Sequence, residues 1–427
     1  MVFATAGCTN TIVTSDKGVL HPDAATDNKA STEVTVREFT KGELYRLLVA
    51  EFAAKRGDLT RAINGYIEVA RDSRDPGVAE RAVRLAMNSG DEEGSLGAAR
   101  LWTSIAPRDI QAAQVYGALL MRAGETQEAV AQFERIVTTN GPEVGFDTVT
   151  EVLSRERDKK SALRAMQQLT SSYQANPYAL YAFARVAARA GELEQSKELL
   201  EQLLDIVPDH ENGIVIYARL LQQEGNITAA LERLTSALDA NQDSQLVRMT
   251  YARLLVDAKH FDAAIQQFEV LTEQIPDNLD VRYALGLLLL QTNHPEKAKT
   301  HFEFLTASPD QRITAFYYLG QIAEISDNLG EALSAYAKVD RGEYFLNAQI
   351  RTAVIFARQG EIDKAREHLQ AIRSKDPTQS MRIYRAEAEI LARHDRLDDA
   401  MSVYDQAIDE NPGNADLLYA RAMLAEK

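Results

Sequence analysis

The feature that most constrains this chain is a short apolar stretch that returns after 34 residues. Tyr217–Leu221 reads YARLL, Tyr251–Leu255 reads YARLL again, and Phe183–Ala187 reads FARVA 34 residues before the first copy. A fixed period of this size indicates one supersecondary unit that cannot bury its apolar face alone, so that neighbouring units must stack. The sequence therefore predicts a repeat array, and not the two or three globular domains that 427 residues would otherwise suggest.

Each repeat has the pattern of two helices joined by a turn. The first helix carries apolar residues at positions 4, 7, 8 and 11, and the second carries a small residue at position 20 and a large apolar residue at position 24. Position 20 is occupied in eleven successive repeats by Ala62, Ala98, Ala129, Ala162, Ser196, Ala230, Ala264, Ala298, Ala332, Ala365 and Ala400. The partners at position 24 are Tyr66, Trp102, Phe133, Met166, Leu200, Leu234, Phe268, Phe302, Tyr336, Leu369 and Tyr404.

A second small residue, at position 8, predicts close contact between the two helices of a repeat. Gly or Ala occupies this position at Ala50, Gly117, Ala184, Ala218, Ala252, Gly286, Gly320, Ala353 and Ala388. A larger side chain there would overpack the contact at a cost of about 1–3 kcal/mol. The whole pattern resembles the tetratricopeptide repeat, and this resemblance implies an all-α solenoid, a right-handed superhelix of about eleven helix pairs.

The repeats divide the chain into four segments. Residues 42–414 form the predicted array, and residues 415–427 begin a further first helix and stop. Two repeats are irregular: residues 77–109 lack the usual small residue at position 8, and residues 143–177 contain the charged turn RERDKK. Each is interpreted either as a local bend of the solenoid or as a repeat whose sequence has drifted.

The N-terminal segments predict a tethered protein. Thr5-Ala6-Gly7 directly before Cys8 resembles the end of a bacterial lipoprotein signal peptide, so residues 1–8 are interpreted as its remnant and Cys8 as a lipidation site. Residues 9–41 are rich in Ser, Thr and Asp and are expected to be a disordered, flexible linker spanning roughly 30 Å. Because Thr9 follows the cysteine, the resemblance implies anchoring at the periplasmic face of the outer membrane. The alternative is an ordinary start with a chance Ala-Gly-Cys, and the short leader and unfinished last helix lead us to expect a longer natural protein.

Composition argues against several classes of function. A formal net charge of -16 disfavours general binding to nucleic acid and to membrane surfaces, so membrane contact is expected only through a lipid anchor. One cysteine cannot build a disulfide framework, and the seven histidines have no ligand spacing typical of a metal site. Phosphate-binding glycine loops, nucleophile elbows and HExxH motifs are absent from the sequence. The chain is therefore predicted to be no enzyme and to need no cofactor or metal.

A predicted protein-binding groove follows from the first helices. In repeats of this kind positions 2, 5, 9 and 12 line the inner groove, and position 9 holds Arg185, Arg219 and Arg253. Tyrosine and arginine are frequent at binding hot spots because they combine apolar area with directional donors. The other groove candidates are Tyr178 at position 2, Tyr181, Tyr283 and Tyr317 at position 5, and a second basic spot formed by Arg382 and Arg385.

The alternative for these arginines is that they are solvated or paired locally. Asp257 lies four residues after Arg253 and would suit a helical ion pair. Arg185 and Arg219 have no acidic residue three or four positions away. A tetratricopeptide clamp for C-terminal carboxylates would need Lys at position 5 and Asn at position 9 of one repeat, and no repeat here has that pair. We therefore expect proteins or extended peptides as ligands, and not chaperone tails.

A more specific resemblance concerns the N-terminal repeats. The block Gly42–Ala86, which begins GELYRLLVAEFAAKRGDLTRA, together with TAGC at residues 5–8, is similar to Gram-negative tetratricopeptide lipoproteins. Those proteins are outer-membrane adaptors that bind and activate periplasmic carboxyl-terminal processing proteases. The resemblance implies a non-enzymatic adaptor that presents proteins to such a protease. The alternative is a structural assembly factor for an outer-membrane or polysaccharide-export complex.

Overall fold

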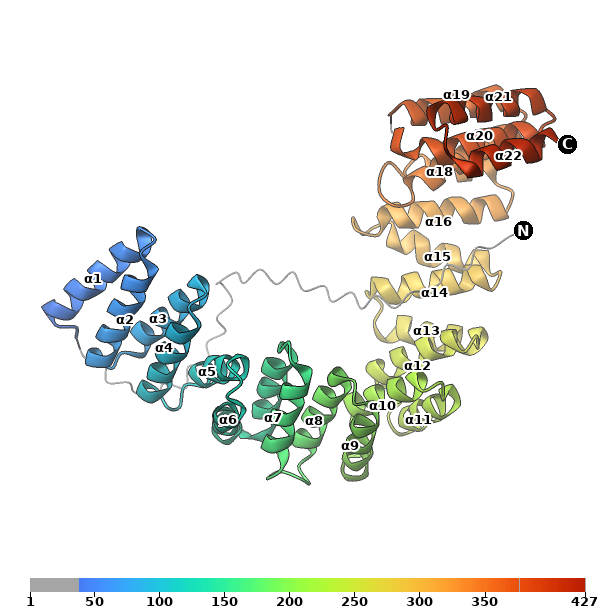
Figure 1. Ribbon diagram of the computed structural model, residues 1–427. Helices are drawn as coiled ribbons and strands as arrows, with labels where there is room; N and C mark the ends of the chain where they lie inside the picture. Colours follow the sequence, from blue (N-terminus) through green and yellow to red (C-terminus); the bar gives the residue numbers. More distant parts are fainter. Residues whose placement is uncertain (1–37, 376, 427) are drawn as a thin grey trace. The chain divides into compact units, whose positions relative to one another are not determined.

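The computed structural model describes residues 38–375 and 377–426, and within them it contains helices and no strands. Within each part of the chain the helices follow one another as successive antiparallel neighbours (Figure 1). Packing divides the described residues into two compact units, unit 1 up to residue 139 and unit 2 from residue 140 onward. Cys8 and the linker up to residue 37 lie outside the described residues.

Unit 1 is built from helices that pack on their neighbours in sequence. Its first helix is capped by Thr40, whose backbone N–H donates to Glu43 Oε2 at 2.7 Å, while Thr40 Oγ1 accepts from the Glu43 N–H at 3.3 Å. The predicted irregular repeat 77–109 forms an ordinary helix pair with a buried Ala98. The helices are α1 (Lys41–Lys55), α2 (Leu59–Ser73), α3 (Pro76–Ser89), α4 (Glu92–Ile105), α5 (Ile110–Arg122) and the first half of α6 (Thr126–Ser154).

The long span α6 consists of two helices that meet at Gly141. Gly141 has φ 77° and ψ 163°, a region of backbone conformation that is essentially restricted to glycine. Pro142 follows at the start of the second half, where its missing N–H does no harm. The second irregular repeat, 143–177, thus begins at a real break in the helix. Its charged turn ends in Asp158, which caps α7 by accepting from the N–H groups of Lys160 and Ser161 at 3.1 Å each.

Unit 2 continues the same pairing, and α22 follows the last pair without a partner helix among the described residues. With the halves of α6 counted separately, the helices make eleven pairs, which confirms the predicted all-α repeat solenoid. No helix in the described part of the chain combines the length and the apolar character needed to cross a membrane. The helices are α7 (Lys159–Thr170), α8 (Pro177–Ala190), α9 (Leu193–Ile206), α10 (Glu211–Gln223), α11 (Ile227–Ala240), α12 (Gln245–Asp257), α13 (Phe261–Gln274), α14 (Leu279–Gln291), α15 (Pro295–Leu305), α16 (Arg312–Ile325), α17 (Leu329–Tyr336), α18 (Phe345–Arg358), α19 (Ile362–Lys375), η1 (Pro377–Gln379), α20 (Ser380–Arg393), α21 (Leu397–Glu410) and α22 (Ala415–Ala425).

Close contact inside a repeat depends on the small residue at position 8, as the sequence predicts. A Cβ atom added to Gly286 would lie 3.0 Å from two atoms of the Phe302 ring, and one added to Gly320 would lie 2.7 Å from two atoms of the Tyr336 ring. Both rings occupy position 24 of the same repeat and are fully buried. Since packed atoms do not approach so closely, only glycine lets these rings lie against the first helix.

Contact between successive repeats is made by positions 3 and 10 of each first helix. Ile383 and Ile390 of α20 lie in one apolar cluster with Ala365 and Leu369 of α19, the second helix of the preceding repeat. All four side chains are at most 5 % exposed. Each repeat therefore depends on the preceding second helix to cover this face, as expected for a solenoid.

Candidate protein-binding surface

Several first helices of unit 2 lie next to the following first helix. α10 contacts α12, and α18 contacts α20. Hydrogen bonds join neighbouring first helices: Gln222 Nε2 donates to Asp257 Oδ2 at 2.7 Å, and Arg382 Nη2 donates to Asn347 Oδ1 at 2.7 Å. We define the first-helix surface as positions 2, 5, 9, 12 and 13 of α8, α10, α12, α14, α16, α18 and α20.

Arg219 and Arg253 are exposed on this surface and make no hydrogen bond or ion pair with any residue that the structure describes. The expected local pair of Arg253 with Asp257 is wrong, because that carboxylate accepts from Gln222 of the neighbouring helix. Residues 140–427 contain 44 Asp and Glu against 31 Lys and Arg, so two unpaired cations stand out in an acidic unit. An unpaired guanidinium retains all its donors for a ligand.

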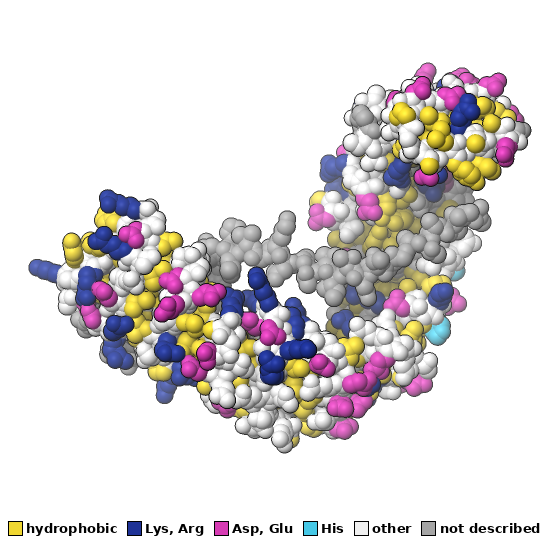
Figure 2. Space-filling model, viewed as in Figure 1, with side chains coloured by type: hydrophobic (Ala, Val, Ile, Leu, Met, Phe, Trp, Pro, Cys, Tyr) yellow, Lys and Arg dark blue, Asp and Glu magenta, His cyan; other side chains and the backbone are white. Residues whose placement is uncertain are grey.

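Arg185, the third arginine of the row, is held in place by its neighbours. Its Nη1 forms an ion pair of 2.6 Å with Asp147 Oδ1, from the second half of α6, and its guanidinium lies 5.3 Å from the centre of the Tyr181 ring. Tyr181 in turn packs against His210, with 4.7 Å between ring centres. Burial raises the pKa of Tyr181, and the charge of Arg185 opposes this rise. Figure 2 shows Lys and Arg side chains gathered over α7 and α8, with acidic side chains between them.

Apolar side chains lie beside the arginines on the same helices. Tyr178, at position 2 of α8, is 41 % exposed, and Leu246, at position 2 of α12, is 39 % exposed. Sequence reasoning missed Leu246, although the repeat position that selected Tyr178 would have found it. It also missed Asp147, which lies 38 residues before Arg185. Partners of groove residues must be sought about one repeat away and not only one helical turn away.

Tyr317 does not belong to the surface, which corrects the prediction for this residue. It is 7 % exposed and stacks on Tyr344, with 4.5 Å between ring centres and 20° between ring planes. The cause is local: α17 has 8 residues where α13 has 14, and the segment after α17 brings Tyr344 against Tyr317. Position 5 of this repeat is therefore covered by the chain itself.

Tyr283 is half-buried and belongs to the same group of rings. Its ring centre lies 6.0 Å from that of Tyr318 and 6.3 Å from that of Phe302. Burial, together with a hydrogen bond to Tyr344, raises the pKa of Tyr283 to about 12. We call Tyr283, Phe302, Tyr317, Tyr318, Tyr336 and Tyr344 the aromatic cluster. It separates the arginine row from the second basic spot along the chain.

The second basic spot is exposed, as the sequence predicts. Arg382 and Arg385, at positions 2 and 5 of α20, are both exposed, and Arg382 is fixed by Asn347. Arg385 lies near Tyr404, whose pKa is raised by burial against the opposing charge of this arginine. Between α14 and α20, Ile325 at position 13 of α16 is 57 % exposed and adds an apolar contact that the sequence did not single out.

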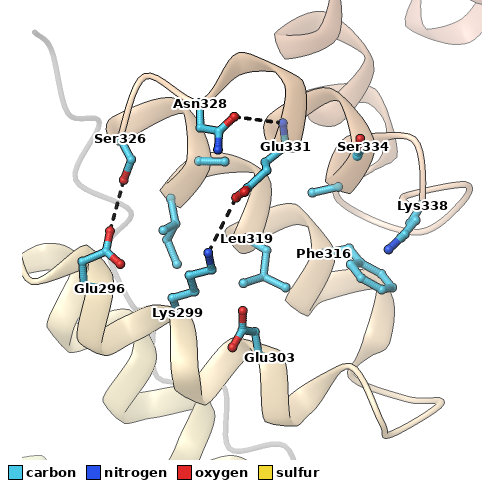
Figure 3. Close-up of a pocket in the computed structure, with 13 residues that line it drawn as sticks. Glu296, Lys299, Glu303, Phe316, Leu319, Ser326, Asn328, Glu331, Ser334 and Lys338 are labelled. Carbon is cyan, nitrogen blue, oxygen red and sulfur yellow. Dashed lines mark hydrogen bonds and ion pairs between the residues drawn. The ribbon is translucent and has the colours of Figure 1, made fainter.

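A cleft of about 500 Å³ opens on the other side of unit 2, between α15 and α17 (Figure 3). Phe316 and Leu319 of α16 line its apolar part. Its two cations have partners: Lys299 lies 3.6 Å from Glu331, and the Lys338 ammonium lies 4.4 Å from the centre of the Phe316 ring. Because these cations already have partners, the cleft offers less for recognition than the arginine row.

The described residues include no group of three or more His, Cys, Asp or Glu side chains that could hold a metal ion. The exposed, donor-rich surface of α8, α10 and α12 instead suits the binding of polypeptide.

Comparison with known proteins agrees with the repeat pattern. Two family models described as tetratricopeptide repeat match, one over residues 221–278 and the other over residues 283–344 and 350–415. TPR repeat-containing protein PA4667 of Pseudomonas aeruginosa is 38 % identical over 409 residues. That match covers 95 % of this chain and 68 % of the relative.

Solved structures of similar proteins are more distant. PilF of Pseudomonas aeruginosa is 20 % identical with a TM-score of 0.36, over 47 % of this chain and 92 % of that one. Yeast Tom70 is 13 % identical with a TM-score of 0.33, over 90 % of this chain and 95 % of the other. From the repeat models and the 38 % identical relative, the chain belongs to the tetratricopeptide repeat family, whose repeats indicate a scaffold for protein–protein interaction.

Proposed function

We propose that this chain is an adaptor of the bacterial cell envelope that binds extended protein segments on the first-helix surface of unit 2 and presents them to a periplasmic carboxyl-terminal processing protease. One observation carries the binding part of this proposal: Arg219 and Arg253 are exposed and without partners, in line with the fixed Arg185. The protease part is supported by the resemblance of residues 42–86 to adaptor lipoproteins.

The chemistry of the surface suits a segment with acidic and apolar side chains. Guanidinium groups form strong, paired hydrogen bonds with carboxylates, which places acidic side chains opposite Arg219 and Arg253. Tyr178 and Leu246 supply apolar area beside them. Since Arg185 is already ordered by Asp147 and Tyr181, less side-chain freedom is lost there on binding.

The envelope part of the proposal places a lipid on Cys8 and the folded repeats at the periplasmic face of the outer membrane. It is supported by the small residues before Cys8 and by the polar linker after it. Replacing Cys8 with serine should move the protein from the membrane fraction to the soluble fraction. A wild-type protein that is soluble and carries no lipid mass by mass spectrometry would contradict this part alone.

Capture from periplasmic extract tests the adaptor role. The wild-type chain should retain a carboxyl-terminal processing protease together with its substrates, identified by mass spectrometry. The double variant Arg219→Ala/Arg253→Ala should retain about tenfold less substrate, as expected when two hot-spot side chains are truncated. The matched control is Arg157→Ala/Lys160→Ala, which removes the same charge from two exposed positions around the start of α7 in unit 2.

Three results would count against the proposal. Equal capture by the two double variants would show that the arginine row does not bind substrate. Capture without any protease or protease substrate would refute the link to proteolysis. Capture of components of outer-membrane assembly or polysaccharide export, together with unchanged protease activity in a strain lacking the chain, would favour the alternative assembly role.

A further inference from the structure

A different apolar surface lies in unit 1, on the exposed side of α1. Leu44, Tyr45, Leu48 and Phe52 are 48 %, 70 %, 59 % and 60 % exposed, and we call them the α1 face. The core side of the same helix buries Ala50 and Ala53. Contiguous exposure of four large apolar side chains on one helix marks an interaction site more often than a neutral surface.

The other repeats show what covers such a face. Tyr45 and Phe52 take positions 3 and 10 of their repeat, and in unit 2 these positions lie under the preceding second helix: Val281 and Leu288 of α14 share a buried cluster with Phe268 of α13. In each first helix from α8 to α20 both positions are buried, at Ala179, Val186, Gly213, Leu220, Val247, Leu254, Val281, Leu288, Ala315, Ile322, Ala348, Ile355, Ile383 and Ile390. The α1 face is thus shaped for a helix.

The spacing and charge of α1 describe that helix further. Lys41, Tyr45, Leu48, Phe52 and Lys55 alternate in steps of four and three, the spacing of a seam between two packed helices. Lys41 and Lys55, one at each end of the seam, are exposed and make no ion pair or hydrogen bond through their side chains within the described part of the chain. Charge complementarity therefore calls for acidic side chains on the partner.

We propose that the α1 face binds an amphipathic helix of a partner protein, with an apolar seam flanked by Asp and Glu, in the place that a preceding second helix takes in other repeats. This surface is separate from the first-helix surface of unit 2 and does not depend on the adaptor role.

Two other occupants fit less well. A second copy would place α1 against α1. Antiparallel pairing about Leu48 would bring Lys41 of one copy against Lys55 of the other, and parallel pairing would bring each lysine against the same lysine of the other copy. In both arrangements like charges repel each other. The chain's own upstream residues lack the pattern of a second helix, because positions 20, 24 and 27 would fall on Asn28, Thr32 and Thr35. These polar residues stand where second helices carry their small and large apolar side chains.

A peptide from this chain provides a probe. The α13 sequence, Phe261–Gln274, has three acidic residues and no basic residue, and in unit 2 it packs on positions 3 and 10 of α14. The peptide, acetylated, amidated and labelled with a fluorophore, is titrated with the full chain at low salt, and fluorescence anisotropy is measured. Saturable binding is expected, weakened about tenfold in Leu48→Ser/Phe52→Ser because the seam loses its anchors. Lys41→Glu/Lys55→Glu should weaken binding about threefold or more through lost complementarity.

Controls distinguish binding at this site from nonspecific binding to exposed apolar side chains. Val144→Ser/Ile206→Ser removes two exposed apolar side chains elsewhere and should leave binding unchanged. A peptide in which Asp262, Glu269 and Glu273 are replaced by lysine should bind more weakly than the original. Circular-dichroism melting of each variant should match wild type, since all the substituted protein residues are exposed; if Leu48→Ser/Phe52→Ser melts lower, Leu48→Gln alone replaces it.

The proposal would be wrong if the peptide showed no saturable binding, or if the α1 substitutions left its binding unchanged. A dimer seen in sedimentation and dissolved by Leu48→Ser/Phe52→Ser would identify a second copy as the occupant. Tighter peptide binding, by about tenfold, in Val34→Ser/Val36→Ser would show that the chain covers its own α1 face. Retention on phosphatidylglycerol vesicles that requires Leu48 and Phe52 would identify lipid instead.

Discussion

Two stretches of the first-helix surface use the same repeat positions in different ways. In α8, α10 and α12, position 9 presents Arg185, Arg219 and Arg253 to solvent. In α14 and α16, the tyrosines at position 5, Tyr283 and Tyr317, pack within the aromatic cluster, and Tyr317 is buried. The repeat position thus determines which face of the helix carries a side chain. The neighbouring segment determines whether a ligand can reach that side chain.

The aromatic stretch is also held by a hydrogen-bonded ion pair at its buried ring Tyr336. The Tyr336 hydroxyl donates to Glu324 Oε1 at 2.6 Å, and Arg351 Nη1 lies 3.1 Å from both oxygens of that carboxylate. Each aromatic pair adds about 0.5–1.5 kcal/mol beyond its buried area. The rings of α14–α18 are thus packed against one another, whereas α10 and α12 leave Arg219 and Arg253 exposed.

The largest expected effect comes from truncating the same repeat position in both stretches. Tyr317→Ala should lower the free energy of unfolding of unit 2 by about 3 kcal/mol, because it removes a buried ring and leaves a cavity. Tyr181→Ala should cost clearly less, since Tyr181 is half-buried and partly solvated. Urea unfolding followed by circular dichroism measures both. Equal losses would show that the two stretches do not differ in the way proposed.

Glycine at position 8 gives the next largest effect. Gly320→Ala should destabilise by about 2 kcal/mol, because the added Cβ meets the Tyr336 ring and the ring must shift. Gly330→Ala is the control: it lies in the neighbouring helix α17, a Cβ there meets nothing within 4 Å, and helix propensity alone should stabilise it by up to about 1 kcal/mol. We expect Gly320→Ala to lower the melting temperature and Gly330→Ala to raise it. A neutral Gly320→Ala would contradict close packing in the aromatic stretch.

The repeat pattern predicted the packing well because its rules are local. Positions 8, 20 and 24 lie within one helix pair, so Gly320 and Tyr336 could be matched from their spacing alone. The break at Gly141 was not predicted, because a single glycine does not reveal its backbone conformation. Only the start of the irregular repeat after it was noticed.

The binding surface was predicted less completely, because its contacts cross from one repeat to the next. Tyr317 was assigned to the groove from its repeat position alone, which does not show that α17 of the same repeat is short or that Tyr344, 27 residues later, covers the ring. Asp147 was missed as the partner of Arg185 because helical spacing was the only distance considered. Arg219 and Arg253 were placed correctly on an exposed helix face, although the proposed pair with Asp257 does not form.

High pH should affect the aromatic stretch through Tyr283. Its pKa is raised to about 12 in the folded state, above the value of about 10 for an unfolded chain. The contribution of this phenol to stability is therefore complete below pH 10 and is lost as the pH rises from about 10 to 12. Tyr283→Phe should flatten this part of the stability profile, measured by urea unfolding at pH 9 and 11.5. If Tyr283→Phe left the dependence of stability on pH unchanged, the Tyr283 phenol would be solvated in the folded state.

The smallest expected effect distinguishes the paired arginine from an unpaired one. Arg185→Ala should lower stability by about 0.5 kcal/mol at low salt, because it removes a partly exposed ion pair with Asp147. Arg219→Ala should change stability by less than this, since no described residue depends on it. Adding Asp147→Ala completes a double-mutant cycle for the pair, and 1 M salt should reduce the measured coupling by screening. If Arg219→Ala were the more destabilising change, Arg219 would have a structural role, and the inference that it is available for a ligand would be wrong.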